Sequence, residues 1–262
     1  EYDSVVEFDV SAKAGYRINA IKGCKGTEFT GGANNNTNQG YSTGAIQQDE
    51  CKVTAEFSKK EYTVTIQDDT GGTAQLLNEG LITHGTKAKV EINLEPGYSF
   101  TGFAGSCGSL ALKAGSTNNY QTVNGITGNC QISVSYALNP VNIDQVQTGN
   151  GFADVHWTKP DNHNLSISIC HADHEISAGD CRDGINGVTL ISATSSPKEV
   201  RLANGFTYRF ALVTSDKRSG KKAAGSIVEA YMPNYYKVSG IIRGDKGGDI
   251  KTSEGELIDN NG

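Results

Sequence analysis

Two segments in the first half of this chain repeat one another, and each carries a pair of cysteines. Gly15-Tyr16 aligns with Gly97-Tyr98, and further on YSTGAIQQDECKVTAEF aligns without a gap with YQTVNGITGNCQISVSY. An internal repeat of this kind means that one small unit of structure is built twice. The repeat therefore restricts the first half of the chain to two similar modules.

Apolar residues recur at every second position in both copies, which is typical of half-buried β-strands. Before the Gly-Tyr pair, the aligned apolar positions are Phe8, Val10 and Ala12 in the first copy and Val90, Ile92 and Leu94 in the second. After the late cysteine they are Val53, Ala55 and Phe57, and Ile132, Val134 and Tyr136. The chain also has 32 glycines, which suit short strands joined by tight turns. We expect an all-β, multi-domain string of small disulfide-closed β modules.

The six cysteines indicate disulfides and hence an oxidising compartment. Each copy of the repeat has one early and one late cysteine, so the simplest pairing is Cys24–Cys51 and Cys107–Cys130. A zinc site is the alternative, but it needs four clustered ligands with a CxxC-type spacing, and neither copy has one.

The order Gly-Tyr, Gly-Cys, Tyr-x-Thr and Cys-x-Val-x-Ala-x-Phe resembles the divergent InlB B-repeat, or bacterial repeat, over about residues 1–138. The resemblance implies a small β-rich, non-catalytic module of secreted or surface proteins, with cysteine-bearing versions frequent in Gram-negative bacteria. The second copy begins with a strand, a glycine turn and a second strand near residues 61–88. Only residues 1–14 precede Gly15, so we expect the natural protein to continue toward its N-terminus.

The next segment, residues 139–233, resembles a fibronectin type III domain, an immunoglobulin-like β-sandwich. Ala153, Val155 and Trp157 alternate before Pro160, and Leu202 stands six residues before Tyr208. The resemblance implies a core tryptophan on the second strand and a tyrosine whose hydroxyl hydrogen-bonds the backbone. Ala203-Asn204 stands where that corner usually has a proline.

The segment CHADHEISAGDC, residues 170–181, is the richest in side chains that bind metals. Neighbouring residues of a strand point to opposite faces, so Cys170 and His171 are poorly placed to share one ion. We expect a Cys170–Cys181 disulfide that closes a loop between two strands. A disulfide removes the thiolate that a Cys–His nucleophile needs, and no GxSxG elbow supports a serine triad. We therefore expect no enzyme activity within this chain.

The tail, residues 234–262, reads as the start of a further β domain. Its carboxylates, Asp245 and Asp249 among them, are the oxygen ligands that calcium uses, but their spacing fits no EF-hand loop. Calcium is the one cofactor for which the sequence offers candidates.

Both repeats place an asparagine-rich loop just before a matched tyrosine. Asparagine and tyrosine are common in loop-borne recognition surfaces, but asparagine and glycine also simply make turns. The loops are therefore either slack tethered by a disulfide or sites for a cell-surface glycan or protein ligand. The candidate ligand-binding residues are Asn35, Asn36, Tyr41, Asn118, Asn119 and Tyr120.

The overall composition argues against two kinds of partner. The net charge is −6 and the lysines are scattered, whereas a nucleic-acid binder needs a basic face. No run approaches the roughly 18 apolar residues of a membrane span, so we expect no membrane insertion.

The sequence predicts a partial repeat (1–59), a full repeat (60–138), a fibronectin-like sandwich (139–233) and a tail (234–262). We expect a non-catalytic extracellular stalk or adhesion region of a larger secreted or surface protein, in contact with its neighbouring domains. The alternative is an accessory region, binding substrate or carbohydrate, of a secreted hydrolase whose catalytic domain lies outside this chain.

Overall fold

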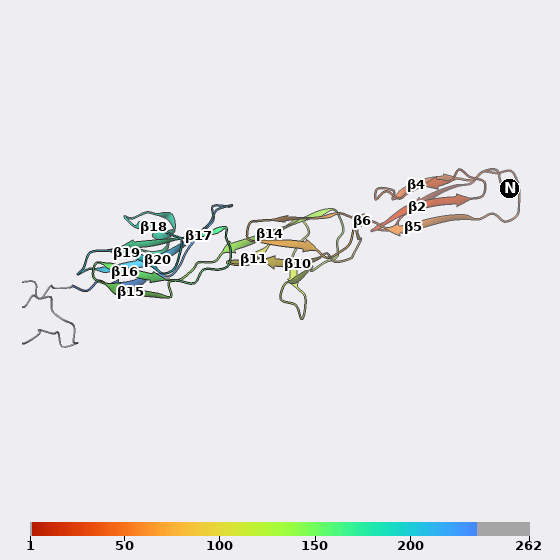
Figure 1. Ribbon diagram of the computed structural model, residues 1–262. Helices are drawn as coiled ribbons and strands as arrows, with labels where there is room; N and C mark the ends of the chain where they lie inside the picture. The colour runs from red at the N-terminus through yellow and green to blue at the C-terminus, as the bar shows by residue number, and fades with distance from the viewer. Residues whose placement is uncertain (1, 235–262) are drawn as a thin grey trace, which may run out of the picture. The chain divides into compact units, whose positions relative to one another are not determined.

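The computed structural model describes residues 2–234, and it divides the chain into two compact units with a boundary between Asn139 and Pro140 (Figure 1). Strands dominate both units, and one short helix is present among the described residues. The all-β prediction is therefore confirmed. The predicted tail lies outside the described residues except for Asn234.

The first unit starts with the first repeat, residues 2–60. Its five strands form a two-stranded sheet, β1-β4, and a three-stranded sheet, β3-β2-β5. The strands are β1 (Glu7–Ser11), β2 (Tyr16–Gly23), β3 (Phe29–Thr30), β4 (Asn38–Ser42) and β5 (Val53–Lys59). Ile18, Ile21 and Tyr41 form a small buried cluster here.

The second repeat, residues 61–139, completes the first unit with two larger sheets, β12-β13-β10-β8 and β11-β14-β7, and a short pair, β6-β9. Strand β7 runs parallel to β14, and β8 runs antiparallel to β10. The strands are β6 (Glu61–Tyr62), β7 (Val64–Asp68), β8 (Gly72–Leu76), β9 (Ile82–Thr83), β10 (Lys89–Leu94), β11 (Tyr98–Gly105), β12 (Leu110–Leu112), β13 (Asn119–Thr122) and β14 (Cys130–Leu138).

A shared irregularity shows that the sequence repeat is a structural repeat. In the first repeat β2 pairs with β5, and the register shifts between Ile18 and Ala20. In the second repeat β11 pairs with β14, and the register shifts between the aligned residues Phe100 and Gly102. Because a β-bulge occurs at the same place in both copies, it is part of the structure of the module and not a peculiarity of one copy.

Both repeats are closed by the predicted cysteine pairs, Cys24–Cys51 and Cys107–Cys130. One prediction about the first repeat was wrong. Its alternating residues Phe8 and Phe57 were expected on half-buried strands, but both side chains are exposed. Their counterparts in the second repeat are buried by strands that the described part of the first repeat does not have.

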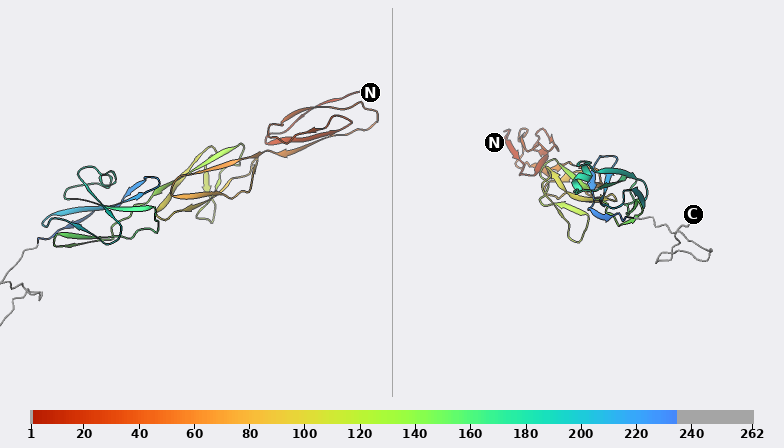
Figure 2. Two further views of the ribbon diagram at one scale, coloured as in Figure 1. Left: turned by 45° about the horizontal axis from the view of Figure 1, so that its top comes forward. Right: turned by 90° about the vertical axis from the view of Figure 1, so that its left-hand side faces the viewer.

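The second unit is a sandwich of the sheet β15-β16-β19 and the sheet β18-β17-β20-β21, with β22 also paired to β20 (Figures 1 and 2). The strands are β15 (Gln145–Gly149), β16 (Phe152–His156), β17 (Leu165–Ala172), β18 (Thr189–Ala193), β19 (Lys198–Arg201), β20 (Thr207–Asp216), β21 (Lys222–Ala224) and β22 (Val228–Tyr231).

The core of this sandwich lies between the two sheets, where the alternating residues of both meet. Val155 on β16 and Ile169 on β17 are completely buried, and Trp157 packs in the same cluster. Tyr208, near the start of β20, is also buried there, and its hydroxyl accepts the backbone N–H of Ala203 at 3.3 Å. The core position predicted for Trp157 and the backbone contact predicted for Tyr208 are therefore confirmed.

The expected loop between Cys170 and Cys181 contains the helix α1 (Ala178–Asp183), so the disulfide joins a strand to a helix and not two strands. Ser177 starts the helix with a capping box: its hydroxyl accepts the N–H of Asp180, whose carboxylate accepts the N–H of Ser177. Gly184 ends it with a φ of 68°. A helix of six residues is marginal alone, and burial of Cys181 beneath the sheet holds it in place.

Candidate functional site

The asparagine-rich loop of the first repeat, residues 31–37, is anchored to the start of the second repeat. The Asn34 amide oxygen accepts the backbone N–H of Glu61 at 3.1 Å, and the amide nitrogen donates to the Glu61 carbonyl oxygen. Arg17 donates through Nη1 to the same Asn34 oxygen at 3.1 Å and pairs through Nη2 with the Glu61 carboxylate at 2.9 Å. Arg17, Asn34 and Glu61 together form what we call the junction clamp.

Backbone contacts around the clamp strengthen the same junction. The N–H of Lys60 donates to the Gly15 carbonyl oxygen at 2.8 Å, and the N–H of His84 donates to the Lys60 carbonyl oxygen at 2.8 Å. The His84 ring lies against Gly15, where a Cβ atom would come within 2.2 Å of it. Gly15 also has a φ of +80°, so both the space and the backbone at this position require glycine.

The structure separates the three candidate ligand residues of this loop. Asn35 is exposed, whereas the Asn36 amide faces the backbone N–H groups of Gly32 and Ala33. Tyr41 is only 4% exposed, and its hydroxyl donates to the Gly23 carbonyl oxygen at 2.6 Å. Of the three, Asn35 alone presents a free polar surface, and Tyr41 is part of the core.

The corresponding loop of the second repeat leads into a half-exposed aromatic cluster. The rings of Phe100, Phe103 and Tyr120 have centroids 4.8 to 5.2 Å apart. The Asn118 amide donates to Glu91 Oε1 at 3.4 Å, and Asn119 Oδ1 is buried without a hydrogen-bond partner in the described part of the chain. We call Phe100, Phe103 and Tyr120 the aromatic cluster. The first repeat has Ile18, Ile21 and buried Tyr41 at the matching places, so the two loops do not form equivalent sites.

Sequence reasoning missed a cavity of about 290 Å³ in the sandwich unit, lined by Trp157, by His163 and by the cationic groups of Lys159 and Lys217. Trp157, Lys159 and His163 come from the segment between β16 and β17, and Lys217 comes from the turn after β20, so no single motif indicated them. The only available signal was a small group of basic residues in an acidic chain. Such a cavity can hold a small anion, although its lysines are exposed and screened by water.

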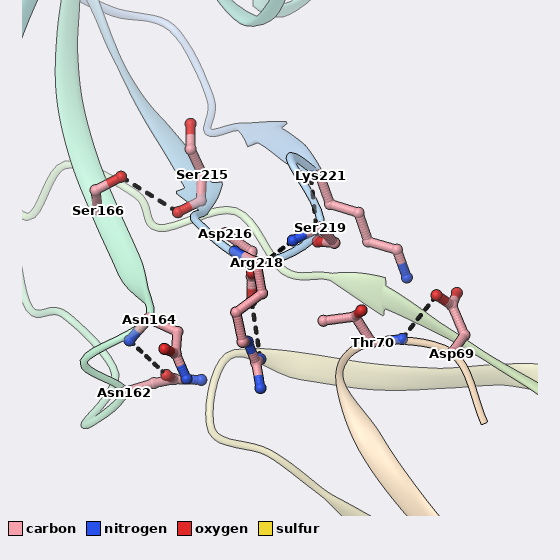
Figure 3. Close-up of polar contacts among 10 residues, drawn as sticks. All are labelled: Asp69, Thr70, Asn162, Asn164, Ser166, Ser215, Asp216, Arg218, Ser219 and Lys221. Carbon is pink, nitrogen blue, oxygen red and sulfur yellow. Dashed lines mark hydrogen bonds and ion pairs between the residues drawn. The ribbon is translucent and has the colours of Figure 1, made fainter.

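Buried Asp216 shapes the turn that follows β20 (Figure 3). Its carboxylate accepts the backbone N–H of Arg218 at 2.6 Å and that of Ser219 at 3.1 Å. The Arg218 guanidinium approaches the second carboxylate oxygen at 2.9 Å. A buried charge with this many donors is well satisfied, so Asp216 acts as a turn anchor.

Cys170 and His171 point to opposite faces of β17, as expected. Cys170 is buried with Cys181, Ala211 and Val213. The His171 ring lies on the other face, 6.2 Å from the ring centroid of Phe210. Within residues 2–234 no group of three or more His, Cys, Asp or Glu side chains is arranged to hold a metal ion. The calcium candidates Asp245 and Asp249 lie outside the described residues.

Two aromatic side chains have shifted pKa values. Burial raises the pKa of Tyr136 well above its usual range, and the neighbouring Asp68 carboxylate, 3.2 Å from the hydroxyl, raises it further. Burial lowers the pKa of His171, while Asp173 acts in the opposite direction. Neither residue adjoins a nucleophile with an orienting partner, so these shifts describe packing and not an acid–base centre.

The part of the chain with the second repeat matches a known family. Residues 62–140 match the divergent InlB B-repeat domain. No curated protein matches the chain. The matched segment starts where β6 ends and contains β7 through β14, so it covers the second repeat including the strands β7 and β8. Repeat domains of this kind are typical of extracellular, non-catalytic regions. No helix in residues 2–234 is long and apolar enough to cross a membrane.

The junction clamp gives a stability prediction. Replacing Asn34 with alanine leaves the Glu61 N–H and carbonyl without side-chain partners, which costs about 1–3 kcal/mol for half-buried groups. We expect Asn34→Ala to lower the denaturant concentration at the unfolding midpoint of the first repeat. Hydrogen exchange of the backbone amides of residues 15–23 and 58–62 measures this midpoint. Asn35→Ala is the matched control, because its side chain is exposed. Equal midpoints for the two variants would contradict the clamp.

The lowered pKa of His171 gives a pH prediction. Below the ordinary histidine pKa of about 6.5 the unfolded chain binds a proton that folded His171 resists, so stability falls as the pH falls through that value. We expect His171→Phe to weaken the drop in the unfolding midpoint of the sandwich between about pH 8 and pH 5.5. His163→Gln, at an exposed histidine, is the control. A variant whose midpoint falls as steeply as that of the unaltered chain would show that His171 is not the group responsible.

Proposed function

We propose that this chain is a disulfide-braced spacer in the extracellular stalk or adhesion region of a larger bacterial protein, with a Gram-negative source favoured by the cysteine-bearing repeats. The observation that carries this proposal is that each repeat and the sandwich has its own short disulfide loop, with sequence separations of 27, 23 and 11 residues. Small modules cannot bury enough apolar surface to be very stable alone, and cross-links supply what the core does not.

The junction clamp supports the same role. A spacer must resist bending and proteolysis where modules join, because loops between modules are the usual cleavage sites. Residues 58–62 run from β5 directly into β6, and the clamp hydrogen-bonds both the side chain and the backbone of this segment. The asparagine loop, on this proposal, acts as a brace between modules.

The sandwich unit is proposed to be a fibronectin type III-like domain. Support comes from the division into the sheets β15-β16-β19 and β18-β17-β20-β21, from buried Trp157 and from the backbone contact of Tyr208 at the corner before β20. Domains of this architecture have many functions, so this fold is equally compatible with a spacer and with a binding module.

A spacer made protease-resistant by its disulfides should lose that resistance when one is removed. Pairing Cys107 with Cys130 contributes roughly 3 kcal/mol in the chain-entropy model. Cys107→Ala combined with Cys130→Ala should therefore speed thermolysin cleavage between residues 107 and 130 by about a hundredfold, when cleavage follows the population of opened molecules. Thr127→Ala, in the same loop, is the control, and cleavage is mapped by mass spectrometry. Unchanged cleavage would contradict a bracing role for this disulfide.

Carbohydrate binding is the second candidate, and the aromatic cluster favours it. A half-exposed group of three packed rings offers a surface on which a sugar ring can stack. The same property would suit an accessory region of a secreted hydrolase. The aligned Tyr41 is not a suitable probe of glycan binding, because its buried ring supports the fold of the first repeat.

A glycan array tests this candidate directly. If the aromatic cluster binds a glycan, Tyr120→Ala should reduce retention of that glycan by roughly tenfold or more, because a central aromatic contact is lost. Tyr231→Ala, at an exposed tyrosine of the sandwich, should leave retention unchanged. Circular dichroism confirms that both variants fold. No retained glycan, or equal retention by both variants, would leave the spacer as the only supported function.

A further inference from the structure

The cavity in the sandwich unit lies at one end of the sandwich, where two connections between its sheets meet. Residues 157–164 cross from β16 to β17, and residues 194–197 cross from β18 to β19. Lys217 comes from the turn that follows β20, which pairs with β17. The strands of a sandwich hold the loops at its ends in place, and such loops carry binding sites in other sandwiches. The cavity therefore lies where a ligand site is expected in this fold.

The most buried residues that line the cavity are apolar and belong to the rigid part of the fold. They are Trp157, Leu165 and Ile167, and we call them the cavity floor. Trp157 and Ile167 are also members of the main core cluster of the sandwich. Side chains packed in a core stay in fixed positions. The floor is therefore formed before a ligand arrives, and it offers an apolar surface to one face of that ligand.

Hydrogen bonds hold the loops around this floor. The Ser196 hydroxyl oxygen accepts the backbone N–H of Trp157 at 2.8 Å, which joins the two connections between the sheets. The backbone N–H of Lys217 donates to the Asn164 carbonyl oxygen at 3.0 Å. Asn162 Oδ1 in turn accepts the backbone N–H of Asn164 at 3.0 Å (Figure 3). The loops that line the cavity are therefore tied to one another, and the shape of the cavity is set by the fold.

The charges around the cavity favour an anion. Lys159 and Lys217 supply two ammonium groups, and the His163 ring adds an N–H donor. No Asp or Glu of the described chain lines the cavity. The Asp216 carboxylate, next to Lys217 in the chain, is already bound by the Arg218 guanidinium at 2.9 Å and by backbone N–H groups. A cavity lined by charges of one sign concentrates ligands of the opposite sign.

The remaining lining groups and the volume narrow the class of ligand. Thr194, Ser195 and Ser196 are consecutive and add hydroxyl groups, each of which can donate and accept a hydrogen bond. The volume of about 290 Å³ is near the lower end, about 300 Å³, of small-molecule sites, so the cavity suits a single ring. A compact anion such as phosphate would leave the apolar floor uncovered. A ligand that uses all the lining groups has a ring, a negative charge and several hydroxyl groups.

We propose that this cavity binds a hexuronic acid, a sugar ring that carries a carboxylate, either free or at the end of an acidic glycan. The carboxylate pairs with the ammonium groups of Lys159 and Lys217. One apolar face of the ring lies on the cavity floor, and the ring hydroxyls exchange hydrogen bonds with Thr194 and Ser195. The site lies within the sandwich unit, so it depends neither on the spacer role nor on the aromatic cluster of the second repeat.

A nuclear magnetic resonance titration of the full chain with sodium glucuronate tests the proposal. We expect saturable shifts of the Trp157 indole N–H and of the backbone amides of residues 157–167 and 193–197. Glucose has the same ring without the charge, and acetate has the charge without the ring. Each should bind about tenfold more weakly or worse, because each lacks part of the contacts. A trisaccharide that ends in glucuronate distinguishes the two sources: tighter binding than free glucuronate identifies the end of a glycan, and equal binding identifies the free sugar acid.

Matched variants make the result specific. Lys159→Ala combined with Lys217→Ala should weaken glucuronate binding by about tenfold or more, because the carboxylate loses both ammonium partners. Both lysines are exposed, so the double variant should fold, and its unperturbed amide spectrum away from the cavity confirms this. Lys113→Ala combined with Lys222→Ala removes the same charge from exposed lysines outside the cavity and should leave the binding unchanged. Tyr120→Ala, in the aromatic cluster, should also leave it unchanged.

Three results would overturn the proposal. The first is the absence of saturable shifts at the residues that line the cavity. The second is binding of glucose or acetate as tight as that of glucuronate, which would make the cavity a neutral-sugar site or a general anion site. The third is an equal loss of binding in the two double lysine variants, which would mean a long-range effect of net charge. None of these results bears on the disulfide-braced spacer, which the protease experiment tests separately.

Discussion

The cross-link between the early and the late strand of each repeat is the constraint on which the other features depend. Cys24 lies just after β2 and Cys51 just before β5, so the disulfide closes the end of the same strand pair that carries the bulge. Because the disulfide fixes that end, the residues between the two cysteines form a closed loop. Tyr41 in this loop packs with Ile18 and Ile21 to form the core of the module. A module of this size would be marginal without the link, because its buried cluster is small.

Alignment of the copies predicted the pairing of the cysteines and the places of the strands, since both follow from spacing and alternation. It could not predict burial. Tyr41 and Tyr120 align, yet Tyr41 is covered by its own module while Tyr120 is half-exposed among phenylalanines. Asn34 shows the same limit: the loop has three consecutive asparagines, and only the fold reveals which one reaches Glu61. The local pattern specifies on which face of a strand a side chain lies, whereas contacts between distant segments decide whether that face is buried.

In the sandwich the reverse holds, because the sequence predicted core residues correctly but did not predict the short helix α1. Trp157 and Tyr208 have strong positional signatures, and both are where the pattern placed them. The helix α1 was missed since its six residues carry no apolar periodicity. Its signals were the capping pair Ser177 and Asp180 and the stop at Gly184, which are short and common in loops. The helix places Cys181 so that the disulfide covers the outer face of β17, opposite the main core.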